Sequence, residues 1–313
     1  MTSVGDARVF SVPMRTRFRG IEVREGMLLR GPAGWGEFSP FWDYDARECR
    51  PWLASAREAA YDGWPAPRRT SIAVNCTVPA TGPDEAAAIV RASGCGTAKV
   101  KVGERGQTEA DDLARVEAVR DALGTEGRLR IDVNGGWDVD TAVRMIRLLD
   151  RFGLEYVEQP CATVEELARV RLAVDVPVAA DESIRRAEDP LRVARLEAAD
   201  IAVLKVQPLG GVAACLRIAE HIGLPVVVSS ALETSVGISA GLALAAALPE
   251  LPYACGLATL QLLDGDVTSE PLRVADGAIA VTRPEPDLAD EVAAAGDTRA
   301  RWQERIASVE ALA

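Results

Sequence analysis

Basic and acidic side chains recur at a nearly constant interval through the middle of the 313-residue chain. Each ends a short run rich in Val, Ile or Ala, and neighbours lie 23 to 31 residues apart, in the order Lys101, Asp132, Glu158, Asp181, Lys205 and Ser229. This interval is the length of one strand plus one helix. We therefore expect these groups at the C-terminal ends of neighbouring parallel strands, the rim that carries the active site in α/β barrels.

Three carboxylates at successive strand ends, Asp132, Glu158 and Asp181, cannot all stay ionised side by side without a cation. Carboxylate oxygens are hard ligands that suit Mg²⁺, Mn²⁺ or Ca²⁺. With Lys101 on one side and Lys205 opposite, the pattern indicates a carboxylate substrate held at a metal and flanked by bases. A single acidic residue at a strand end is more often a helix cap or a surface group. That interpretation does not explain why such residues stand at the ends of several successive strands.

Alternation along the strands assigns further side chains to the same rim. Lys99 and Lys101 share one face, as do Arg130, Asp132 and Asn134, while the residues between them are apolar and face the helices. Charged groups inside a barrel are costly unless they are paired or coordinated. Arg130 and Asn134 are therefore predicted to orient the site from inside the barrel or to pack there.

Composition excludes several classes of protein. The chain has 35 basic and 47 acidic residues and a net charge of −12. It therefore lacks the excess of Lys and Arg that binding to nucleic-acid phosphates requires. The only histidine, His221, lies in a segment with helical periodicity and is predicted to be at the surface. This excludes active sites that need a histidine in the site, such as the Ser-His-Asp triad of hydrolases and His-ligated zinc sites. Six widely spaced cysteines form no C-x-x-C pair and are predicted to be small buried residues, as fits a reducing cytoplasm.

The longest apolar stretch, residues 237–248, is shorter than the ~20 residues that span a bilayer, and is predicted to be a buried helix. Residues 1–8 lack the basic start and apolar core of a secretory signal. We therefore expect a cytoplasmic protein without membrane insertion.

The fold class follows from the alternation of strand-like and helix-like segments after residue 70. A helical run at 110–123 has its apolar positions on one face. Eight strands that alternate with helices predict a parallel sheet. The first strand is not followed by a G-x-G-x-x-G loop, which would be the strongest signal for an open, doubly wound sheet. We therefore predict a closed α/β barrel. The expected strands are 71–75, 98–102, 129–133, 155–158, 176–181, 201–206, 225–229 and 254–257.

Residues 1–70 lack the regular alternation of strands and helices and are predicted to form a smaller α+β domain. A hairpin is expected between 17–24 and 27–30, with its turn at Glu25-Gly26, followed by a helix at 47–60. The tail, residues 265–313, has a last helix near 298–312 and is predicted to pack back on that domain. Residues 71–264 would then form the catalytic barrel.

Five motifs together resemble the enolase superfamily, and within it the muconate-lactonizing subgroup. They are Lys99-x-Lys101, Arg130-Ile-Asp132-Val-Asn134, Val157-Glu158-Gln-Pro160, Ala180-Asp181-Glu182-Ser183 and Leu204-Lys205-Val-Gln-Pro208. The resemblance implies a (β/α)₇β TIM-like barrel under a capping domain built from both termini. It implies that Asp132, Glu158 and Asp181 bind Mg²⁺ (or Mn²⁺), that Lys101 and Lys205 are catalytic on opposite faces of the substrate, and that Lys99 contacts its carboxylate.

Within this subgroup the chain most resembles the o-succinylbenzoate synthase family of the actinobacterial kind. Ser229-Ser230 occupy the region of the His base of another subgroup, and Gly256–Thr259 lack the Asp-x-Asp that dipeptide epimerases carry. The resemblance implies a hydro-lyase of menaquinone biosynthesis that dehydrates 2-succinyl-6-hydroxy-2,4-cyclohexadiene-1-carboxylate through α-proton abstraction and a metal-stabilised ene-diolate, chemistry for which this superfamily is a known example. Substrate contacts are predicted at Lys99, Arg130, Asn134, Ser229, Ser230 and Gly256, where the glycine would leave room for a succinyl chain.

Several alternatives stay open. An N-succinylamino acid racemase would use the same lysines and metal, and a muconate cycloisomerase would share the scaffold. A Schiff-base aldolase would use Lys205 as a nucleophile but has no need of three carboxylates. A metal-binding scaffold protein would need neither lysine. The expected partner is a small carboxylate, with oligomeric state open, and cap segments 13–20 and 35–42 are candidate contacts.

Overall fold

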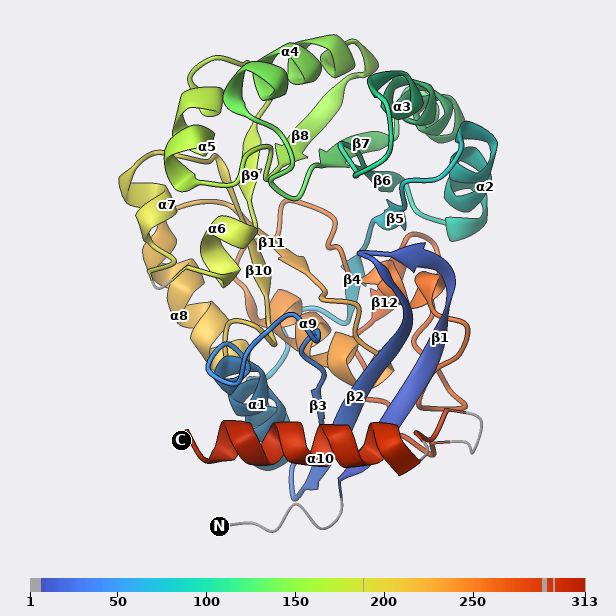
Figure 1. Cartoon of the computed structure of the whole chain (residues 1–313), viewed down its shortest axis with the longest axis vertical. Helices are drawn as coiled ribbons and strands as arrows, with labels where there is room; N and C mark the ends of the chain where they lie inside the picture. The colour runs from blue at the N-terminus through green and yellow to red at the C-terminus, as the bar shows by residue number, and fades with distance from the viewer. Residues whose placement is uncertain (1–6, 188, 289–291, 295, 313) are drawn as a thin grey trace.

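The centre of the molecule is a parallel seven-stranded sheet curled into a barrel wall, in the order β11-β10-β9-β8-β7-β6-β5 (Figure 1). The computed structural model describes residues 7–312 apart from 188, 289–291 and 295. Parallel bridges from Cys255 to Val74 and from Gly256 to Ser229 close the ring in place of an eighth regular strand. The strands are β5 (Cys76–Val78), β6 (Thr97–Lys101), β7 (Arg128–Asp132), β8 (Leu154–Glu158), β9 (Val178–Ala180), β10 (Ile201–Lys205) and β11 (Val226–Ser229).

Helices cover the outside of this wall (Figure 1). Side chains cap three of these helices at their N-termini, since Thr108, Asp138 and Thr163 each accept a hydrogen bond from a backbone N–H in the first turn. The covering elements are α2 (Pro83–Ser93), α3 (Glu109–Leu123), α4 (Val139–Leu149), η3 (Asp150–Phe152), α5 (Val164–Arg171), α6 (Glu182–Arg185), α7 (Arg192–Arg195), α8 (Val212–Ile222) and α9 (Ser235–Ala247), with η4 (Ala258–Leu262) after the barrel closes.

Helix α9 is buried along its whole length, which confirms the buried helix predicted from the apolar run at 237–248. It lies between the barrel and the capping sheet, so both of its sides are covered and its sequence needs no polar face. Within the part of the chain that the structure describes, no helix combines the length and apolarity needed to cross a bilayer.

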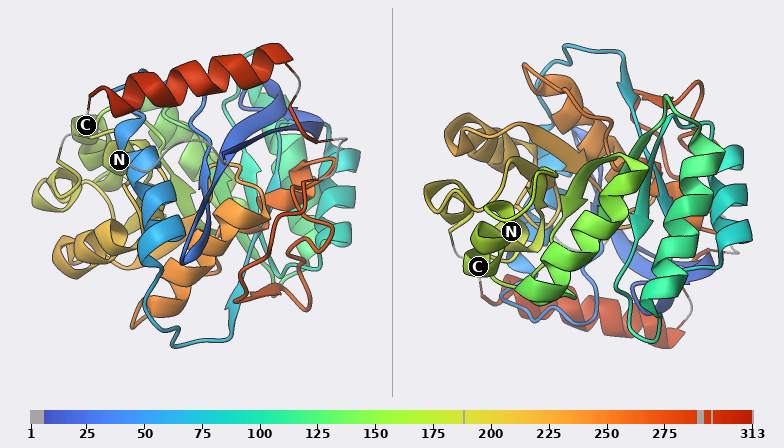
Figure 2. Two further views of the ribbon diagram at one scale, coloured as in Figure 1. Left: turned by 90° about the horizontal axis from the view of Figure 1, so that it is seen from below. Right: turned by 90° about the horizontal axis from the view of Figure 1, so that it is seen from above.

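The capping domain is a three-stranded antiparallel sheet with helices from both ends of the chain. Its strands are β1 (Arg8–Phe18), β2 (Ile21–Gly31) and β3 (Gly34–Phe38), followed by α1 (Arg50–Arg57) and a π-helical turn η2 (Glu58–Asp62). Helix α10 (Gly296–Glu310) lies along the cap (Figure 2). Its Trp302 ring meets Phe38 edge-on at 5.9 Å in the shared core.

The predicted hairpin turn at Glu25-Gly26 is wrong. The chain turns at Arg19-Gly20, where both residues have positive φ, and Gly26 lies inside β2. A side chain at Gly26 would lie 2.6 Å from the Phe10 ring, so this glycine serves a close approach within the sheet.

The predicted first barrel strand at 71–75 is also displaced. Residues 71–73 form β4 (Ser71–Ala73), which pairs antiparallel with β12 (Ala278–Ala280), and the barrel begins instead at Cys76 in β5. Part of the tail therefore joins the barrel, while α10 packs on the cap. Apolar content alone could not distinguish these two consecutive short strands.

The cap core predicts a large effect of truncating Trp302, which is fully buried. We expect Trp302→Ala to lower the free energy of unfolding by about 3–5 kcal/mol, because both transfer energy and packing are lost. Leu172→Ala is the matched control, since Leu172 is 83% exposed and should change stability by less than about 0.5 kcal/mol. Urea unfolding followed by fluorescence measures both, and equal values for the two variants would contradict the role given to Trp302.

Candidate active site

A cavity of about 830 Å³ lies where the C-terminal ends of the barrel strands face the capping domain. The cap contributes residues 16–20 and Phe41 to its wall. The barrel contributes the predicted residues Lys99, Lys101, Asp132, Asn134, Lys205, Ser229 and Ser230. The strand-end spacing in the sequence thus placed these groups at one rim.

On one side of the rim two lysines share a carboxylate. Lys101 Nζ lies 2.6 Å from Asp132 Oδ2, and Lys99 Nζ lies 3.0 Å from the same oxygen and 2.7 Å from Glu158 Oε1. Lys101 also donates to Asn134 Oδ1. The register explains the contacts, because Lys101 pairs with Asp132 across β6 and β7, and Asp132 pairs with Glu158 across β7 and β8.

The other side of the rim holds the third carboxylate and the third lysine. Lys205 Nζ, at the end of β10, donates to Asp181 Oδ2 at 2.6 Å, and Arg185 Nε donates to Asp181 Oδ1 at 2.9 Å. The Gln159 side chain accepts from the Asp181 backbone N–H at 3.0 Å and fixes the start of α6. Lys101 and Lys205 thus stand at strands β6 and β10, with three strands of the curved wall between them.

These three lysines are the only lysines in the chain, and the other 32 of its 35 basic residues are arginines. Arginine serves elsewhere for charge and hydrogen bonding, but its guanidinium does not lose a proton in proteins. A side-chain ammonium group that can release a proton is thus present only at these three positions. This count was a signal in the sequence that singles out Lys99, Lys101 and Lys205 without any spacing argument.

The buried carboxylates lie in unequal surroundings. Burial would raise the pKa of Asp132, but the charges of Lys101 and Lys99 outweigh it and hold that pKa well below its ordinary value. Arg185 and Lys205 outweigh burial in the same way and lower the pKa of Asp181 to about 2. For Glu158, burial and the neighbouring charge of Asp132 raise the pKa to about 7. The existing cations therefore do not balance the whole acidic cluster.

Within the described part of the chain, Glu158 has a carboxylate oxygen without a partner, and a divalent cation would suit it. Glu158 Oε2 is buried and has no hydrogen-bond partner among the described residues. As the side chains lie, no three His, Cys, Asp or Glu groups within the described ranges are arranged to hold an ion, because ammonium groups contact the acidic oxygens. The donor set of Asp132, Glu158 and Asp181 is all carboxylate oxygen, as suits Mg²⁺ or Mn²⁺, and one oxygen is left for it.

Arg130 faces the barrel interior as strand alternation predicts, but it lies outside the cavity wall. Its Nε donates to Glu155 Oε2 at 2.6 Å, and one terminal nitrogen donates to the Ala254 carbonyl at 2.7 Å. The guanidinium is stacked 4.7 Å from the Tyr156 ring. Arg130 is therefore packed and charge-paired here, with one terminal nitrogen buried and without a hydrogen-bond partner among the described residues, and a substrate contact at Arg130 stays a prediction.

Gly256 is closely approached by the neighbouring strand. A Cβ atom there would lie 2.5 Å from Ser229 Oγ, so the glycine serves this close approach, and its contact with a substrate stays a prediction. Ser229 and Ser230 do line the cavity, with Ser230 Oγ 2.6 Å from Thr259 Oγ1.

Two residues that the sequence analysis missed connect the cap to the acidic cluster. Arg185, which contacts Asp181, also donates to the Tyr44 hydroxyl and, at 2.5 Å, to Glu182 Oε1. No motif marks Tyr44, because the cap and barrel segments that meet here are 141 residues apart in sequence. By contrast, His221 is exposed and all six cysteines are buried and free, as predicted.

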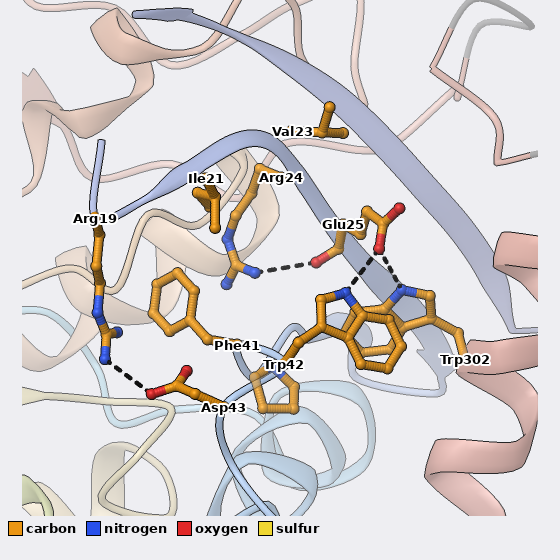
Figure 3. Close-up of a pocket in the computed structure, with 10 residues that line it drawn as sticks. Arg19, Ile21, Val23, Arg24, Glu25, Phe41, Trp42, Asp43 and Trp302 are labelled. Carbon is orange, nitrogen blue, oxygen red and sulfur yellow. Dashed lines mark hydrogen bonds and ion pairs between the residues drawn. The ribbon is translucent and has the colours of Figure 1, made fainter. Parts of the chain in front are cut away.

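The cap candidates divide between two pockets. Residues 16–20 line the barrel cavity, whereas Trp42 lies in a shallow outer pocket against Trp302 (Figure 3). Both indole N–H groups donate to Glu25 Oε2, at 2.9 and 3.3 Å. Trp42 therefore belongs to the cap seam, and Phe41 lies between the two pockets and lines both.

Two family profiles match consecutive parts of the chain. Residues 9–60 match the family described as enolase N-terminal domain-like, and residues 83–288 match enolase C-terminal domain-like. The chain is 69% identical to an o-succinylbenzoate synthase of Thermobifida fusca (strain YX), over 97% of this chain and 96% of that protein. It is 55% identical to the o-succinylbenzoate synthase of Mycolicibacterium smegmatis, over 97% and 95% of the two chains. The chain belongs to the enolase superfamily, in its o-succinylbenzoate synthase family.

Solved structures of the superfamily agree with the fold. The L-Ala-D/L-Glu epimerase from Bacillus subtilis has a TM-score of 0.76 at 25% identity, covering 93% of this chain and 98% of that one. A muconate lactonizing enzyme from Pseudomonas fluorescens has a TM-score of 0.77 at 22% identity, covering 96% of each chain, and bears on the fold alone. The predicted superfamily, fold and enzyme family are thereby confirmed.

In this member of the superfamily, a buried polar network fastens the cap to the loop after β11. Arg24 Nε donates to the Leu232 carbonyl at 2.8 Å, and the same guanidinium donates to the Ala231 carbonyl at 3.3 Å (Arg24 is also in Figure 3). Ala231 and Leu232 line the cavity. Arg24 therefore fixes part of the cavity wall from the cap side.

Glu37, on strand β3 of the cap, extends this network to helix α9. Its carboxylate accepts from the backbone N–H groups of Thr234 and Gly237, at 3.1 and 3.0 Å, at the N-terminus of α9. Glu233 Oε2 accepts from the Ala231 N–H at 2.6 Å and is buried next to Glu37. Burial and the Glu37 charge raise the pKa of Glu233 to about 7.

A pH dependence of stability follows from Glu233. Between the ordinary carboxyl pKa of 4.5 and about 7, the folded protein holds a proton that the unfolded chain releases. This group therefore makes the free energy of unfolding fall as pH rises through that interval. Glu233→Gln should remove this contribution, so that wild type loses more stability than the variant from pH 4.5 to 7 in urea unfolding. The control is Glu250→Gln, an exposed acid, and parallel pH profiles for wild type and Glu233→Gln would contradict the assignment.

Proposed function

We propose that this chain catalyses the Mg²⁺-dependent syn dehydration of 2-succinyl-6-hydroxy-2,4-cyclohexadiene-1-carboxylate to o-succinylbenzoate, a step of menaquinone biosynthesis. One observation carries the proposal: Lys101 and Lys205 stand on opposite sides of one cavity whose rim holds the buried carboxylates. The names of the relatives support the same reaction.

Lys101 is proposed as the base and then the acid. Its neutral amine takes the proton from C1, the carbon that carries the carboxylate, and the ammonium then protonates the hydroxyl leaving C6 on the same face. The C1–H and C6–O bonds break, a C1=C6 double bond forms, and water departs from an aromatic product. Asp132 and Asn134 hold the Lys101 amine in position through their contacts with Nζ.

Lys99 and Lys205 are proposed as fixed cations. Burial would lower the pKa of Lys99, but the charges of Asp132 and Glu158 outweigh it and hold the pKa well above its ordinary value. Lys99 therefore stays protonated and is suited to contact the substrate carboxylate rather than to accept a proton. Lys205, held by Asp181, faces the reacting carbon from the side opposite Lys101 and stabilises the negative charge that develops there.

Asp132, Glu158 and Asp181 would hold the divalent cation. When bound, it supplies positive charge at the substrate carboxylate and makes the neighbouring C–H proton acidic enough for an amine to remove. Arg185 and Gln159 keep Asp181 oriented through the bonds described above.

N-succinylamino acid racemase activity is the second candidate, because both lysines reach the cavity and either one could exchange a proton with a substrate. The two reactions differ in what Lys205 must do, since only racemisation requires it to exchange a proton. Deuterium incorporation from solvent into both enantiomers of an N-succinylamino acid, beside turnover of the cyclohexadiene, measures each activity in the same preparation.

Replacing the proposed base should abolish turnover without loss of the metal. We expect Lys101→Ala to lower kcat by roughly 10² to 10⁴-fold, the contribution of a positioned general base. Mn²⁺ binding, measured by electron paramagnetic resonance, should be at least as tight as in wild type because Asp132 loses a competing ammonium. Near-wild-type turnover with metal bound would refute the role of Lys101.

Replacing Glu158 should instead act on the metal. We expect Glu158→Gln to weaken Mg²⁺ or Mn²⁺ binding by roughly 10-fold to 100-fold or more, because a neutral amide replaces a charged ligand. The matched control is Glu165→Gln, an exposed acid on α5. Unchanged metal affinity in calorimetric titration would remove Glu158 from the proposed ligand set.

A further inference from the structure

The cavity concentrates positive charge in an acidic protein. The chain carries a net charge of −12, yet its wall contains eight cationic side chains and three acidic ones. The cations are Arg17, Arg19, Lys99, Lys101, Arg105, Arg185, Arg186 and Lys205, and the acids are Glu104, Asp132 and Glu182. An excess of this kind favours a ligand with more than one negative charge.

Most of these cations are already paired within the protein. The three lysines contact the buried carboxylates, and Arg185 contacts Asp181 and Glu182. Arg186 lies 2.9 Å from Glu48 and Arg19 lies 3.5 Å from Asp43, with the Arg19 guanidinium also 4.1 Å from the Phe41 ring centroid. These groups are held by their partners and are not available for a second anion.

Arg17 and Arg105 are the exceptions among the described residues of the wall. Both side chains are exposed, and neither has an acidic group within 4.0 Å or a hydrogen-bond partner in the part of the chain that the structure describes. Two arginines that open into a cavity without protein partners retain their full capacity to bind a carboxylate.

Both arginines line the cavity, and the chain segments that carry them adjoin Lys101. Arg17 precedes Phe18, whose ring centroid lies 5.4 Å from Lys101 Nζ. Arg105 lies in the loop after β6, four residues beyond Lys101. One comes from the cap and the other from the barrel, so an anion bound between them would join the two domains over the base.

The proposed substrate supplies such an anion, and this inference rests on the proposed function. Its ring carboxylate is directed to Lys99 and the acidic cluster, and its succinyl chain starts from the adjacent ring carbon and ends in a second carboxylate. We propose that Arg17 and Arg105 bind the terminal carboxylate of the succinyl chain and determine specificity for a dianionic substrate.

Guanidinium groups suit this position for two reasons. They form paired hydrogen bonds with a carboxylate, and they stay protonated in proteins. The binding energy comes from a part of the substrate that does not react, so its loss should appear first in KM.

The test compares two ligands on four proteins: wild type, Arg17→Met, Arg105→Met and the double variant. The dianion is o-succinylbenzoate, and the monoanion is 2-butanoylbenzoate, which keeps the ring carboxylate and ketone but lacks the terminal carboxylate. Calorimetric titration with Mg²⁺ present gives Kd for each. Arg68→Met is the matched control, because Arg68 is exposed in a pocket at the opposite end of the barrel.

We expect the double variant to bind the dianion about tenfold or more weakly, with the monoanion unchanged, and KM to rise by a similar factor with kcat near wild type. Each single variant should show part of the loss, and Arg68→Met none. The proposal is overturned if the double variant keeps the wild-type affinity for the dianion, or if both ligands lose affinity equally.

The outcome is separable from that of the proposed function. If wild type failed to dehydrate the cyclohexadiene, the proposed reaction would fall, while a preference of wild type for the dianion that disappears in the double variant would still support the arginine site. If wild type dehydrated the substrate but showed no preference between the two ligands, the reaction would stand and the arginine site would fall.

Discussion

The structure depends on the balance of charge at the buried end of the barrel. Asp132, Glu158 and Asp181 are each at most 1% exposed, and three carboxylates in that position are tolerated only because cations surround them. The lysines and Arg185 neutralise two of the three, and Glu158 retains an oxygen without a partner. The same imbalance that costs stability leaves an acidic oxygen available to the divalent cation proposed above, so the fold and the proposed chemistry share one requirement.

The use of lysine follows from the same requirement. A chain with 32 arginines and three lysines separates two tasks: arginine supplies permanent charge, and lysine supplies an amine that can lose a proton. At Lys99 the neighbouring acids keep the amine protonated, whereas Lys101 has the Asn134 amide as its second partner in place of a second carboxylate. The two lysines on this strand thus have different partners, and the roles proposed for them follow that difference.

Strand-end chemistry was predictable from the sequence because it depends on local rules. Period-two alternation and the length of a strand plus a helix placed Lys101, Asp132 and Lys205 at one rim without knowledge of any contact. The contacts that the sequence did not predict come from long-range proximity. Gly256 is a glycine because Ser229 approaches it from the neighbouring strand, and the partners of Arg130 lie on three other segments of the chain. Neither fact is encoded near the residue concerned.

The cap shows why a second domain is needed for the site to be complete. Tyr44 reaches Arg185 and through it Asp181, Arg24 holds the carbonyls of Ala231 and Leu232, and Glu37 caps the start of α9. Each contact joins a cap residue to a helix or loop that follows a barrel strand, so these segments are held by the cap as well as by the strands. Helix α10, from the other end of the chain, also contributes to this connection. Arg305 donates to the carbonyls of Phe41 and Tyr44 and thereby positions the segment that carries the Tyr44 hydroxyl. The last helix of the chain is thus connected to the acidic cluster through three side chains, which explains physically why both termini are built into one cap.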